Sequence, residues 1–268
     1  MKPAAFDYHA AASVADALGL LQRLGADARI LAGGQSLGPM LNLRSVRPSH
    51  LIDISRIAAL QSIESRSDGS IRLGAGVTHA QIEDASTSTL PGDTGRYLRH
   101  VAQGIAYRAI RTRGTLAGSL ANADPAADWP VALAALDARI ELAGPTGLHT
   151  VPVAAFVVGV FATTATPDQM VTAIEIPGSP TFGWGYRKET RKAGEFPHAL
   201  AACVHRGGPT AKVWLGAMQG RPLAIDIDLG SREAMYTRMH ASLAAVSDAY
   251  ERHLHALTAI SAVIEAQA

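Results

Sequence analysis

Two short stretches of the sequence combine glycine with polar side chains in patterns that suit a large anionic ligand. The first, Gly33-Gly34-Gln35-Ser36, directly follows an apolar segment, residues 28–32, that is typical of a β-strand. Successive amides in such a turn can converge on one anion, because glycine adopts backbone angles closed to other residues. The second stretch spans residues 111–129 and reads R-T-R-G-T-L-A-G-S-L-A-N-A-D-P-A-A-D-W. Its small side chains let a bulky ligand approach the backbone, and its hydroxyls and carboxylates offer hydrogen-bond partners.

Each stretch also has a purely structural interpretation. A patch rich in glycine and alanine is typical of a tight corner between a strand and a helix in a protein core. Asp124 followed by Pro125 has the pattern of a helix N-cap and first helical residue, with the helix continuing through the apolar run 130–136. Three nearby arginines either contact a ligand or partner, or are solvated charges beside a buried turn: Arg108, Arg111 and Arg113.

Two common nucleotide-binding motifs are missing from the sequence. Residues 74–79 follow a predicted strand, but His79 occupies the third glycine position of the dinucleotide fingerprint G-x-G-x-x-G. No G-K-[ST] sequence occurs, which excludes a P-loop. We therefore expect His79 to begin a helix rather than to act as a catalyst.

The single cysteine limits the redox chemistry that this chain can perform by itself. Cys203 lies in the apolar segment 199–204, and we expect it to be a small core residue. One cysteine cannot form a disulfide within the chain, nor supply a cysteine-ligated iron–sulfur cluster or zinc site alone. No Ser/His/Asp or Cys/His nucleophilic arrangement stands out, so we expect no catalytic side chain and no metal site. Redox chemistry here needs an organic cofactor.

Composition and charge describe an ordinary soluble protein with two or three subdomains. The chain has 268 residues, of which 48% are hydrophobic, and a formal net charge of +1. That charge gives no reason to expect nucleic acid or an anionic membrane surface as a partner. The first residues carry no apolar signal core, and the longest apolar run, residues 151–162, is too short to span a membrane. We expect a cytoplasmic protein.

Periodicity and turn residues predict an α+β fold. Strands are expected at residues 29–32, 51–54, 62–64, 71–73, 139–142, 149–153 and 170–176, with helices at 13–24, 94–105 and 129–136. Residues 177–180 read P-G-S-P and form the clearest linker. We therefore expect a first domain, 1–177, with subdomains of about 1–57 and 58–177, and a C-terminal domain, 178–268. In that second domain we expect a three-stranded antiparallel sheet (182–188, 199–205, 211–217), followed by helices 232–246 and 248–266.

Taken together, the two glycine-bearing stretches resemble the medium, FAD-binding subunit of the molybdenum hydroxylases. That group includes xanthine dehydrogenases, carbon monoxide dehydrogenases and bacterial N-heterocycle dehydrogenases. The segments that carry the likeness are residues 32–37, 51–55, 74–79 and 111–128, and the resemblance covers essentially the whole chain. It implies a two-part FAD-binding domain of the vanillyl-alcohol-oxidase/PCMH type and a small C-terminal domain. The C-terminal part departs from the family by being short, since residues 219–223 lead quickly to the final helices.

The resemblance also implies which residues bind the cofactor. The pyrophosphate would rest on the turn that follows the first strand, formed by Ala32, Gly33, Gly34, Gln35, Ser36 and Leu37. The second motif, which approaches the ribityl chain and the far side of the pyrophosphate, matches Thr115, Ala117, Gly118 and Ser119. Ala117 stands where the family usually has glycine, and we expect a slightly looser approach or a shifted turn there. Asp124 and Asp128 would accept hydrogen bonds from cofactor hydroxyls, unless each serves only as a helix cap.

Two more positions are implied beside the flavin ring. Val171 falls where the family has an aliphatic residue, and Lys188, with Arg187 as the alternative, falls where it has a cation. A positive charge there would stabilise the reduced ring and raise its potential. The structural alternative is an exposed strand residue in a charge-rich turn.

The implied function is that of an electron-transfer subunit that carries FAD. The resemblance implies a large partner subunit with molybdopterin cytosine dinucleotide and a small one with [2Fe–2S] clusters, assembled as a dimer of heterotrimers. Electrons would pass from the clusters to FAD and on to an external acceptor. An N-heterocycle, a purine, an aldehyde and carbon monoxide are all candidate substrates, because the specificity pocket would lie on another chain. The alternatives are a self-sufficient FAD-dependent oxidoreductase of the same fold with its own small-molecule substrate, and a structural subunit that has lost the cofactor.

Overall fold

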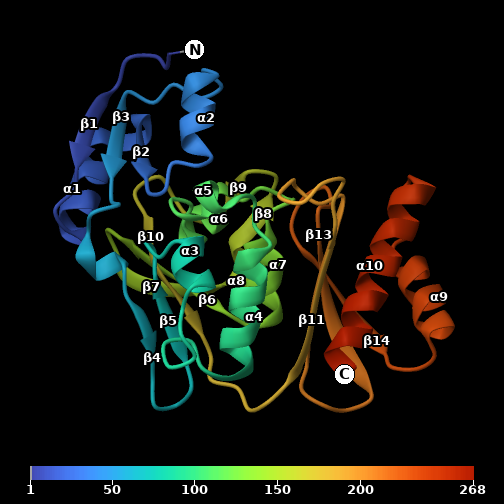
Figure 1. The fold of residues 1–268 in the computed structure, drawn as a ribbon. Helices are drawn as coiled ribbons and strands as arrows, with labels where there is room; N and C mark the ends of the chain where they lie inside the picture. The colour runs from blue at the N-terminus through green and yellow to red at the C-terminus, as the bar shows by residue number, and fades with distance from the viewer. Residues whose placement is uncertain (1) are drawn as a thin grey trace.

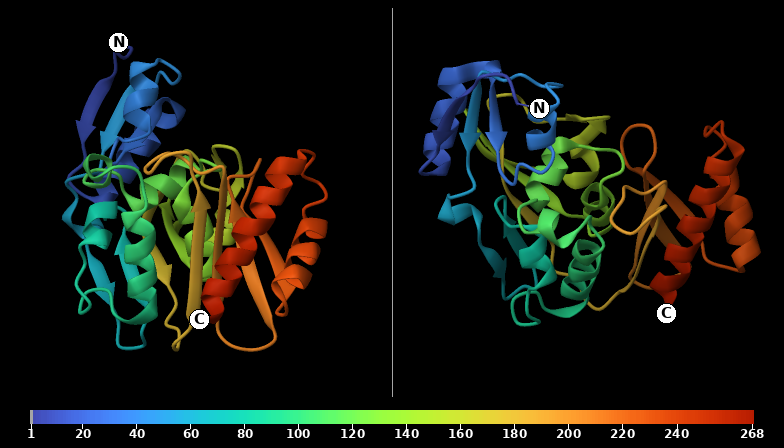
Figure 2. Two further views of the ribbon diagram at one scale, coloured as in Figure 1. Left: turned by 45° about the vertical axis from the view of Figure 1, so that its right-hand side comes forward. Right: turned by 45° about the horizontal axis from the view of Figure 1, so that its top comes forward.

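Three main β-sheets follow one another along the chain, as Figure 1 shows for the computed structural model, which describes residues 2–268. The first sheet holds three strands, the second five and the third four, and a two-stranded hairpin accompanies them. In both views of Figure 2 the first sheet and the C-terminal helix pair lie at opposite ends of the molecule. Helices of the middle part fill the space between the second and third sheets.

The first sheet is parallel and ends in the glycine turn. Its strands, in the spatial order β1-β3-β2, are β1 (Asp7–Ala10), β3 (His50–Asp53) and β2 (Ala28–Leu31). Helix α1 (Val14–Leu24) confirms the predicted first helix: the Ser13 side chain caps it and Gly25 ends it with a φ of 65°. The short helix α2 (Leu37–Asn42), which the sequence did not predict, follows the glycine turn. Gly38 and Pro39 give that segment little intrinsic helix preference.

The second sheet is antiparallel and brings the middle of the chain together. Its order is β4 (Ile63–Ser65), β5 (Ile71–Gly74), β10 (Met170–Ile176), β6 (Arg139–Gly144) and β7 (Gly147–Pro152). The predicted strand 170–176 is confirmed with its bounds unchanged. The helices of this part are α3 (His79–Glu83), α4 (Gly92–Gln103), α5 (Arg108–Arg111), α6 (Leu116–Asn122), α7 (Asp128–Ala135) and α8 (Val153–Phe156). A hairpin of β8 (Val157–Gly159) and β9 (Ala162–Thr163) completes it.

The prediction that Asp124 caps a helix is wrong. Helix α6 ends at Ala123, which adopts the left-handed conformation with a φ of 49°. Helix α7 then begins only at Asp128, with Ala127 as its N-cap. The Asp124 carboxylate instead accepts a hydrogen bond from the Ala126 amide (3.0 Å), which closes a local turn. A contact from the third sheet fixes this turn, since the Ala217 amide donates to the Pro125 carbonyl oxygen (2.8 Å).

The third sheet has four antiparallel strands rather than the expected three. They are β11 (Gly183–Glu189), β12 (Ala199–His205), β13 (Thr210–Gly216) and β14 (Leu223–Asp228). The sequence pattern missed β14 because it is an edge strand with mostly exposed side chains, two of them aspartates. Helices α9 (Arg232–Ser242) and α10 (Ala249–Gln267) cover one face of this sheet, and α7 packs on the other (Figure 1).

Two hydrophobic clusters hold these parts together. The larger one runs from α1 through the second sheet to one face of the third sheet, and Trp129, Tyr97 and Phe156 are its bulkiest fully buried members. The smaller one lies between the third sheet and the helices α9 and α10. Cys203 belongs to it, which confirms the expected core role, and burial raises the pKa of its thiol to about 12. Within residues 2–268, no helix is long and apolar enough to cross a membrane.

His79 begins α3, as predicted, and the core holds it as a neutral ring. The Trp129 indole Nε1 donates to His79 Nδ1 (3.0 Å), and the His79 amide donates to the Gly114 carbonyl oxygen (2.9 Å). Burial, together with the nearby Arg111 charge, lowers the pKa of His79 from 6.5 to about 4.

Because α10 packs closely on β11, one methyl group added at Gly185 should lower the stability of the fold. A Cβ at Gly185 would overlap with the Ala262 carbonyl oxygen of α10. We expect Gly185→Ala to lower the free energy of unfolding by about 1–3 kcal/mol, measured by urea denaturation. Gly19→Ala is the matched control: it lies inside α1 with nothing near its added Cβ, and should stabilise by roughly 0.5–1 kcal/mol. Equal stability of Gly185→Ala and the wild type would contradict this packing.

The lowered pKa of His79 predicts an acid-dependent loss of stability. A histidine whose pKa falls on folding stabilises the folded state above its ordinary pKa of 6.5, and that contribution is lost as the pH falls toward about 4. The loss amounts to about 3 kcal/mol at 1.36 kcal/mol per pKa unit. We expect the difference in free energy of unfolding between wild type and His79→Gln to shrink over this range. If the free energies of unfolding of the two proteins change in parallel with pH, His79 does not cause the acid-dependent loss of stability.

Candidate functional site

The two glycine-bearing stretches, about 80 residues apart in sequence, touch each other in the structure. A Cβ at Gly33 would overlap with the Arg113 carbonyl oxygen and approach the Gly114 Cα to 2.9 Å. Only glycine therefore fits at this position. The neighbouring Gly34 has a φ of 72°, a conformation that also favours glycine. The turn after β2 thus rests directly on the backbone that leads into α6.

The turn presents a set of amides that have no protein acceptor. None of the amides of Gly33, Gly34, Gln35 and Ser36 donates a hydrogen bond within the described chain, residues 2–268. Leu37 then begins α2, and Ala32 precedes the turn at the end of β2. Unpaired amides at a glycine turn are donors of the kind that a phosphate group requires. The residues present therefore fit a pyrophosphate.

The second stretch leaves fewer groups free. The Thr115 hydroxyl accepts the Gly118 amide (3.0 Å) and so caps α6. The Ser119 hydroxyl is half-buried and has no hydrogen-bond partner among residues 2–268, which leaves it available to a ligand. The Ala117 methyl is 3% exposed and belongs to the large hydrophobic cluster. It therefore points into the core and does not fill space beside Ser119.

A pocket of about 520 Å³ opens where the two stretches meet. Three predicted site residues line it: Ala32, Gly33 and Thr115. The other lining residues come from the loop after β3, from the α3 region and from the end of α5, and they are Ser55, Arg56, Gln61, Gly76, Thr78, Ala80, Gln81, Asp84, Thr112 and Arg113. Polar side chains from three separate segments therefore face one cavity.

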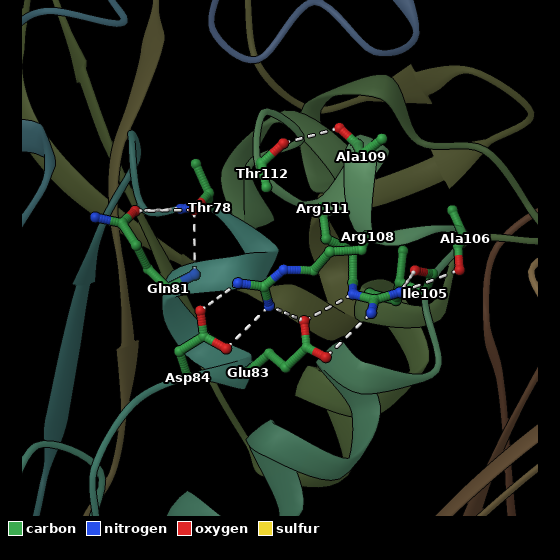
Figure 3. Close-up of polar contacts among 10 residues, drawn as sticks. All are labelled: Thr78, Gln81, Glu83, Asp84, Ile105, Ala106, Arg108, Ala109, Arg111 and Thr112. Atoms are coloured by element: carbon green, nitrogen blue, oxygen red, sulfur yellow. Dashed lines mark hydrogen bonds and ion pairs between the residues drawn. The ribbon is translucent and has the colours of Figure 1, made fainter.

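An ion-pair network lies next to this pocket and reaches its lining through Asp84; Figure 3 shows the contacts within the network. Arg111 is buried and binds both oxygens of Glu83, at 2.8 and 3.0 Å, and it also donates to the Ile105 and Ala106 carbonyl oxygens. Arg108 pairs with Glu83 and Asp84. These hydrogen bonds hold the carboxylates ionised: Arg111 is the main cause of the lowered pKa of Glu83, and Arg108 of the lowered pKa of Asp84. Two of the three candidate arginines are thus neutralised by protein acids.

A second polar cluster surrounds Asp128, which is 6% exposed. Its Oδ1 accepts hydrogen bonds from Lys188 Nζ (2.7 Å) and from the Tyr186 hydroxyl. Lys188 Nζ also donates to the Gly104 carbonyl oxygen (2.6 Å). Burial, followed by the Asp128 charge, raises the pKa of Tyr186. Asp128 Oδ2 has no hydrogen-bond partner within residues 2–268, so one carboxylate oxygen is left for a ligand hydroxyl.

Strand β11 places the two candidate cations, Arg187 and Lys188, on opposite faces of the third sheet. Neighbouring strand residues point to opposite faces of a sheet, so Arg187 and Lys188 diverge. Lys188 reaches Asp128, whereas Arg187 pairs with Glu265 of α10 on the other face. Tyr186 shares the Asp128 face with Lys188. Sequence analysis missed Tyr186, although its position two residues before Lys188 on a strand could have indicated it.

The remaining predicted residues do not line the pocket. The turn after β2 contains Gly34, Gln35 and Ser36, and α2 begins with Leu37. Helix α6 carries the half-buried residues Gly118 and Ser119. Asp124 lies in the turn before α7, and Val171 is buried in β10 as part of the large cluster. Sequence analysis also missed Arg56, for which a single exposed arginine after a strand gave no signal. Within residues 2–268, no cluster of His, Cys, Asp and Glu is arranged to hold a metal ion.

Comparison with known proteins identifies relatives of this chain. A family model described as the FAD binding domain in molybdopterin dehydrogenase matches residues 4–179. The carbon monoxide dehydrogenase medium chain of Afipia carboxidovorans is 40% identical over 231 residues, which cover 83% of this chain and 78% of that relative. The 6-hydroxypseudooxynicotine dehydrogenase complex subunit alpha of Paenarthrobacter nicotinovorans is 40% identical over 207 residues, which cover 76% and 68%.

The solved structures extend this similarity over the whole fold. A carbon monoxide dehydrogenase from Hydrogenophaga pseudoflava, which lacks the Mo-pyranopterin moiety of the molybdenum cofactor, gives a TM-score of 0.90 at 31% identity. The match covers 100% of this chain and 99% of that chain. The resemblance noted in the sequence is confirmed: this chain belongs to the family of FAD-binding medium subunits of the molybdenum hydroxylases.

Proposed function

We propose that this chain is the FAD-binding electron-transfer subunit of a molybdenum hydroxylase complex. In this proposal it takes electrons from the [2Fe–2S] clusters of a small partner subunit and passes them to an external acceptor. The observation that carries the proposal is the contact between Gly33 and the Arg113–Gly114 backbone, which brings four unpaired amides beside the second glycine stretch. Bound FAD supplies the capacity to accept and release electrons singly or in pairs.

The residues of this chain bind and orient the cofactor. The amides of residues 33–36 bind the pyrophosphate, with Ala32 and Leu37 beside it. The Ser119 hydroxyl donates a hydrogen bond to a cofactor hydroxyl or accepts one from it, and the free Asp128 Oδ2 accepts a hydrogen bond from a cofactor hydroxyl. The other proposed contacts come from the second glycine-bearing stretch and from β10. They are Thr115, Ala117, Gly118 and Asp124 in the stretch, and Val171 in β10.

Lys188 is proposed as the cation beside the flavin ring. Its ammonium is held by two fixed acceptors, the Asp128 carboxylate and the Gly104 carbonyl oxygen. Its side chain is 16% exposed, so its position is defined by these partners rather than by solvent. Removal of this cation leaves the Asp128 carboxylate without its ion-pair partner, so the local charge becomes more negative.

The proposal includes the domain organisation and the assembly. The two-part domain of the vanillyl-alcohol-oxidase/PCMH type covers residues 1–177, with subdomains of about 1–57 and 58–177, and the third sheet with its helices forms residues 178–268. The separation of the chain into successive sheets supports this division. The proposed partners are a molybdopterin large subunit and a [2Fe–2S] small subunit in a dimer of heterotrimers. The names of two relatives, a medium chain and a complex subunit, support the assignment to a multi-subunit protein. The proposed location is the cytoplasm, testable by cell fractionation.

Flavin uptake by the purified chain tests the cofactor site. We expect one FAD per chain, detected by its absorbance bands, and a loss of uptake in Gly33→Ala, because a Cβ there forces the two stretches apart. The control is Gly38→Ala, which has nothing near its added Cβ. Ser119→Ala provides a milder variant, and we expect it to weaken FAD binding about 5-fold, the value of one hydrogen bond.

The outcomes separate the three functions that the sequence left open. Co-purification with iron–sulfur and molybdenum subunits expressed alongside would support the electron-transfer role. Turnover of a small organic donor by the isolated chain would instead favour a self-sufficient oxidoreductase. A well-folded chain that takes up no FAD would favour a structural subunit.

The two cations of β11 give a second test. We expect Lys188→Met to lower the reduction potential of bound FAD, because a nearby cation stabilises the added electrons. Arg187→Met removes the same charge from the opposite face of the sheet and should leave the potential unchanged. Redox titration of the FAD-loaded proteins measures both values. If only Arg187→Met changes the reduction potential, then Arg187 and not Lys188 lies beside the ring.

A further inference from the structure

We propose that Arg111 is a positioning residue for Lys188. It fixes the turn between α4 and α5, and the Gly104 carbonyl oxygen of that turn is one of the two acceptors that hold the Lys188 ammonium. This inference rests on the proposed function, in which Lys188 is the cation beside the flavin ring. It assigns a task to a buried arginine that does not line the pocket.

The turn between the two helices contains one strained residue. Ala106 has a φ of 43°, in the left-handed region that a residue with a Cβ adopts only at an energetic cost. The Gly104 and Ile105 amides still bond back to α4, at the Val101 and Ala102 carbonyl oxygens (both 3.1 Å). The chain then reverses at Ala106, beyond the reach of these helical hydrogen bonds. Strained backbone of this kind persists only where its surroundings hold it, so a further contact is required.

Arg111 supplies that contact. Its Nη1 donates to the Ile105 and Ala106 carbonyl oxygens, at 2.9 and 3.1 Å (Figure 3). Neither of these oxygens accepts another hydrogen bond within residues 2–268. The Nε and Nη2 atoms donate to the two oxygens of Glu83, which fixes the plane of the guanidinium group. Helix α3, which ends at Glu83, is therefore linked to the turn through Arg111.

The turn passes this constraint on to Lys188. The Gly104 carbonyl and the Ile105 amide belong to one peptide group, which α4 holds through the amide and Arg111 holds through the carbonyl that follows. Without Arg111, two carbonyl oxygens lose their donors and the turn is free to relax. The Gly104 carbonyl oxygen then shifts, and Asp128 is the fixed partner that remains for the ammonium.

This task needs the shape of arginine as well as its charge. The guanidinium group donates in a fixed plane to one carboxylate and two carbonyl oxygens. A lysine ammonium carries the same charge, but its single nitrogen cannot reach all of these acceptors. Arg108 is the natural comparison, because it pairs with Glu83 and Asp84 and donates to no carbonyl oxygen within residues 2–268. It belongs to the same network but does not hold the turn.

Redox titration of the FAD-loaded full chain tests the inference. We expect Arg111→Lys to lower the reduction potential of FAD, in the same direction as Lys188→Met and by a smaller amount. The physical reason is that an ammonium that leaves its place for solvent acts more weakly on the ring, since attraction falls with distance and with hydration. The double variant should have the potential of Lys188→Met alone, because Arg111 acts through Lys188.

Arg108→Lys is the matched control for this titration. It makes the same change of side chain within the same network and should leave the potential unchanged. Additive shifts in the double variant would overturn the inference. So would an unchanged potential in Arg111→Lys beside a lowered one in Lys188→Met.

A second measurement does not depend on the flavin. Acetylation of Lys188 by acetic anhydride in the FAD-free chain, followed by mass spectrometry, reports how freely its amine leaves the two acceptors. We expect Arg111→Lys to speed this modification about 5-fold, the effect of losing one hydrogen bond. Arg108→Lys should be modified like the wild type, and circular dichroism checks that every variant folds.

The outcomes separate this inference from the proposed function. If Lys188 in a folded Arg111→Lys protein is modified at the wild-type rate, the inference is wrong while the proposed function stands. If modification is faster but Lys188→Met leaves the potential unchanged, the cation does not lie beside the ring. The proposed role of Lys188 then fails, and this inference fails with it.

Glu83→Gln provides an independent variant if Arg111→Lys does not fold. It removes the charge that aligns the Arg111 guanidinium group. Loss of a negative charge by itself raises the reduction potential, whereas release of the turn lowers it, so the two effects have opposite signs. We expect a lower potential and faster acetylation of Lys188. A higher potential, or an unchanged rate of acetylation, would overturn the inference.

Discussion

The contact between Gly33 and the Arg113–Gly114 backbone is the constraint on which the rest of the site depends. It brings the carboxyl end of a parallel strand against the entrance of α6, where a side chain at position 33 would separate the two segments. The core supports this contact, because the His79 ring packs against Gly114 and accepts a hydrogen bond from the buried Trp129. A turn with free amides is thereby fixed to the largest core side chain of the molecule. An anion bound there would meet donors that need little rearrangement.

The buried charged groups of the site are paired with one another. Arg111 and Glu83 satisfy each other almost completely, and Arg111 also fixes two carbonyl groups in the turn after α4. Such pairing is needed because an isolated buried charge is strongly destabilising. That turn continues to Gly104, whose carbonyl oxygen binds Lys188. The arginine network and the Asp128 cluster are thus connected through one short backbone segment.

The third sheet joins the site from the opposite direction. Its strand β11 carries Tyr186 and Lys188 to Asp128 at the start of α7. The end of β13 fastens the preceding turn, through the hydrogen bond from Ala217 to Pro125. Three segments that are distant in sequence therefore fix the position of the Asp128 carboxylate. The similarity to solved structures of the family extends over the whole chain and therefore includes the third sheet.

The sequence by itself determined the features that depend on neighbouring residues. The first helix, the apolar strand 170–176 and the helical start at His79 all follow from local pattern, and the structure confirms them. Only the tertiary structure decided which of several equivalent side chains meet. Arg108 and Arg111 are neutralised whereas Arg113 is not, Lys188 rather than Arg187 reaches Asp128, and Asp124 closes a turn instead of capping a helix. The physical reason is that propensity and periodicity act over a few residues, whereas the partner of a side chain is chosen by elements far apart in the chain. Arg108 and Asp84 are 24 residues apart, and Lys188 and Asp128 are 60 residues apart.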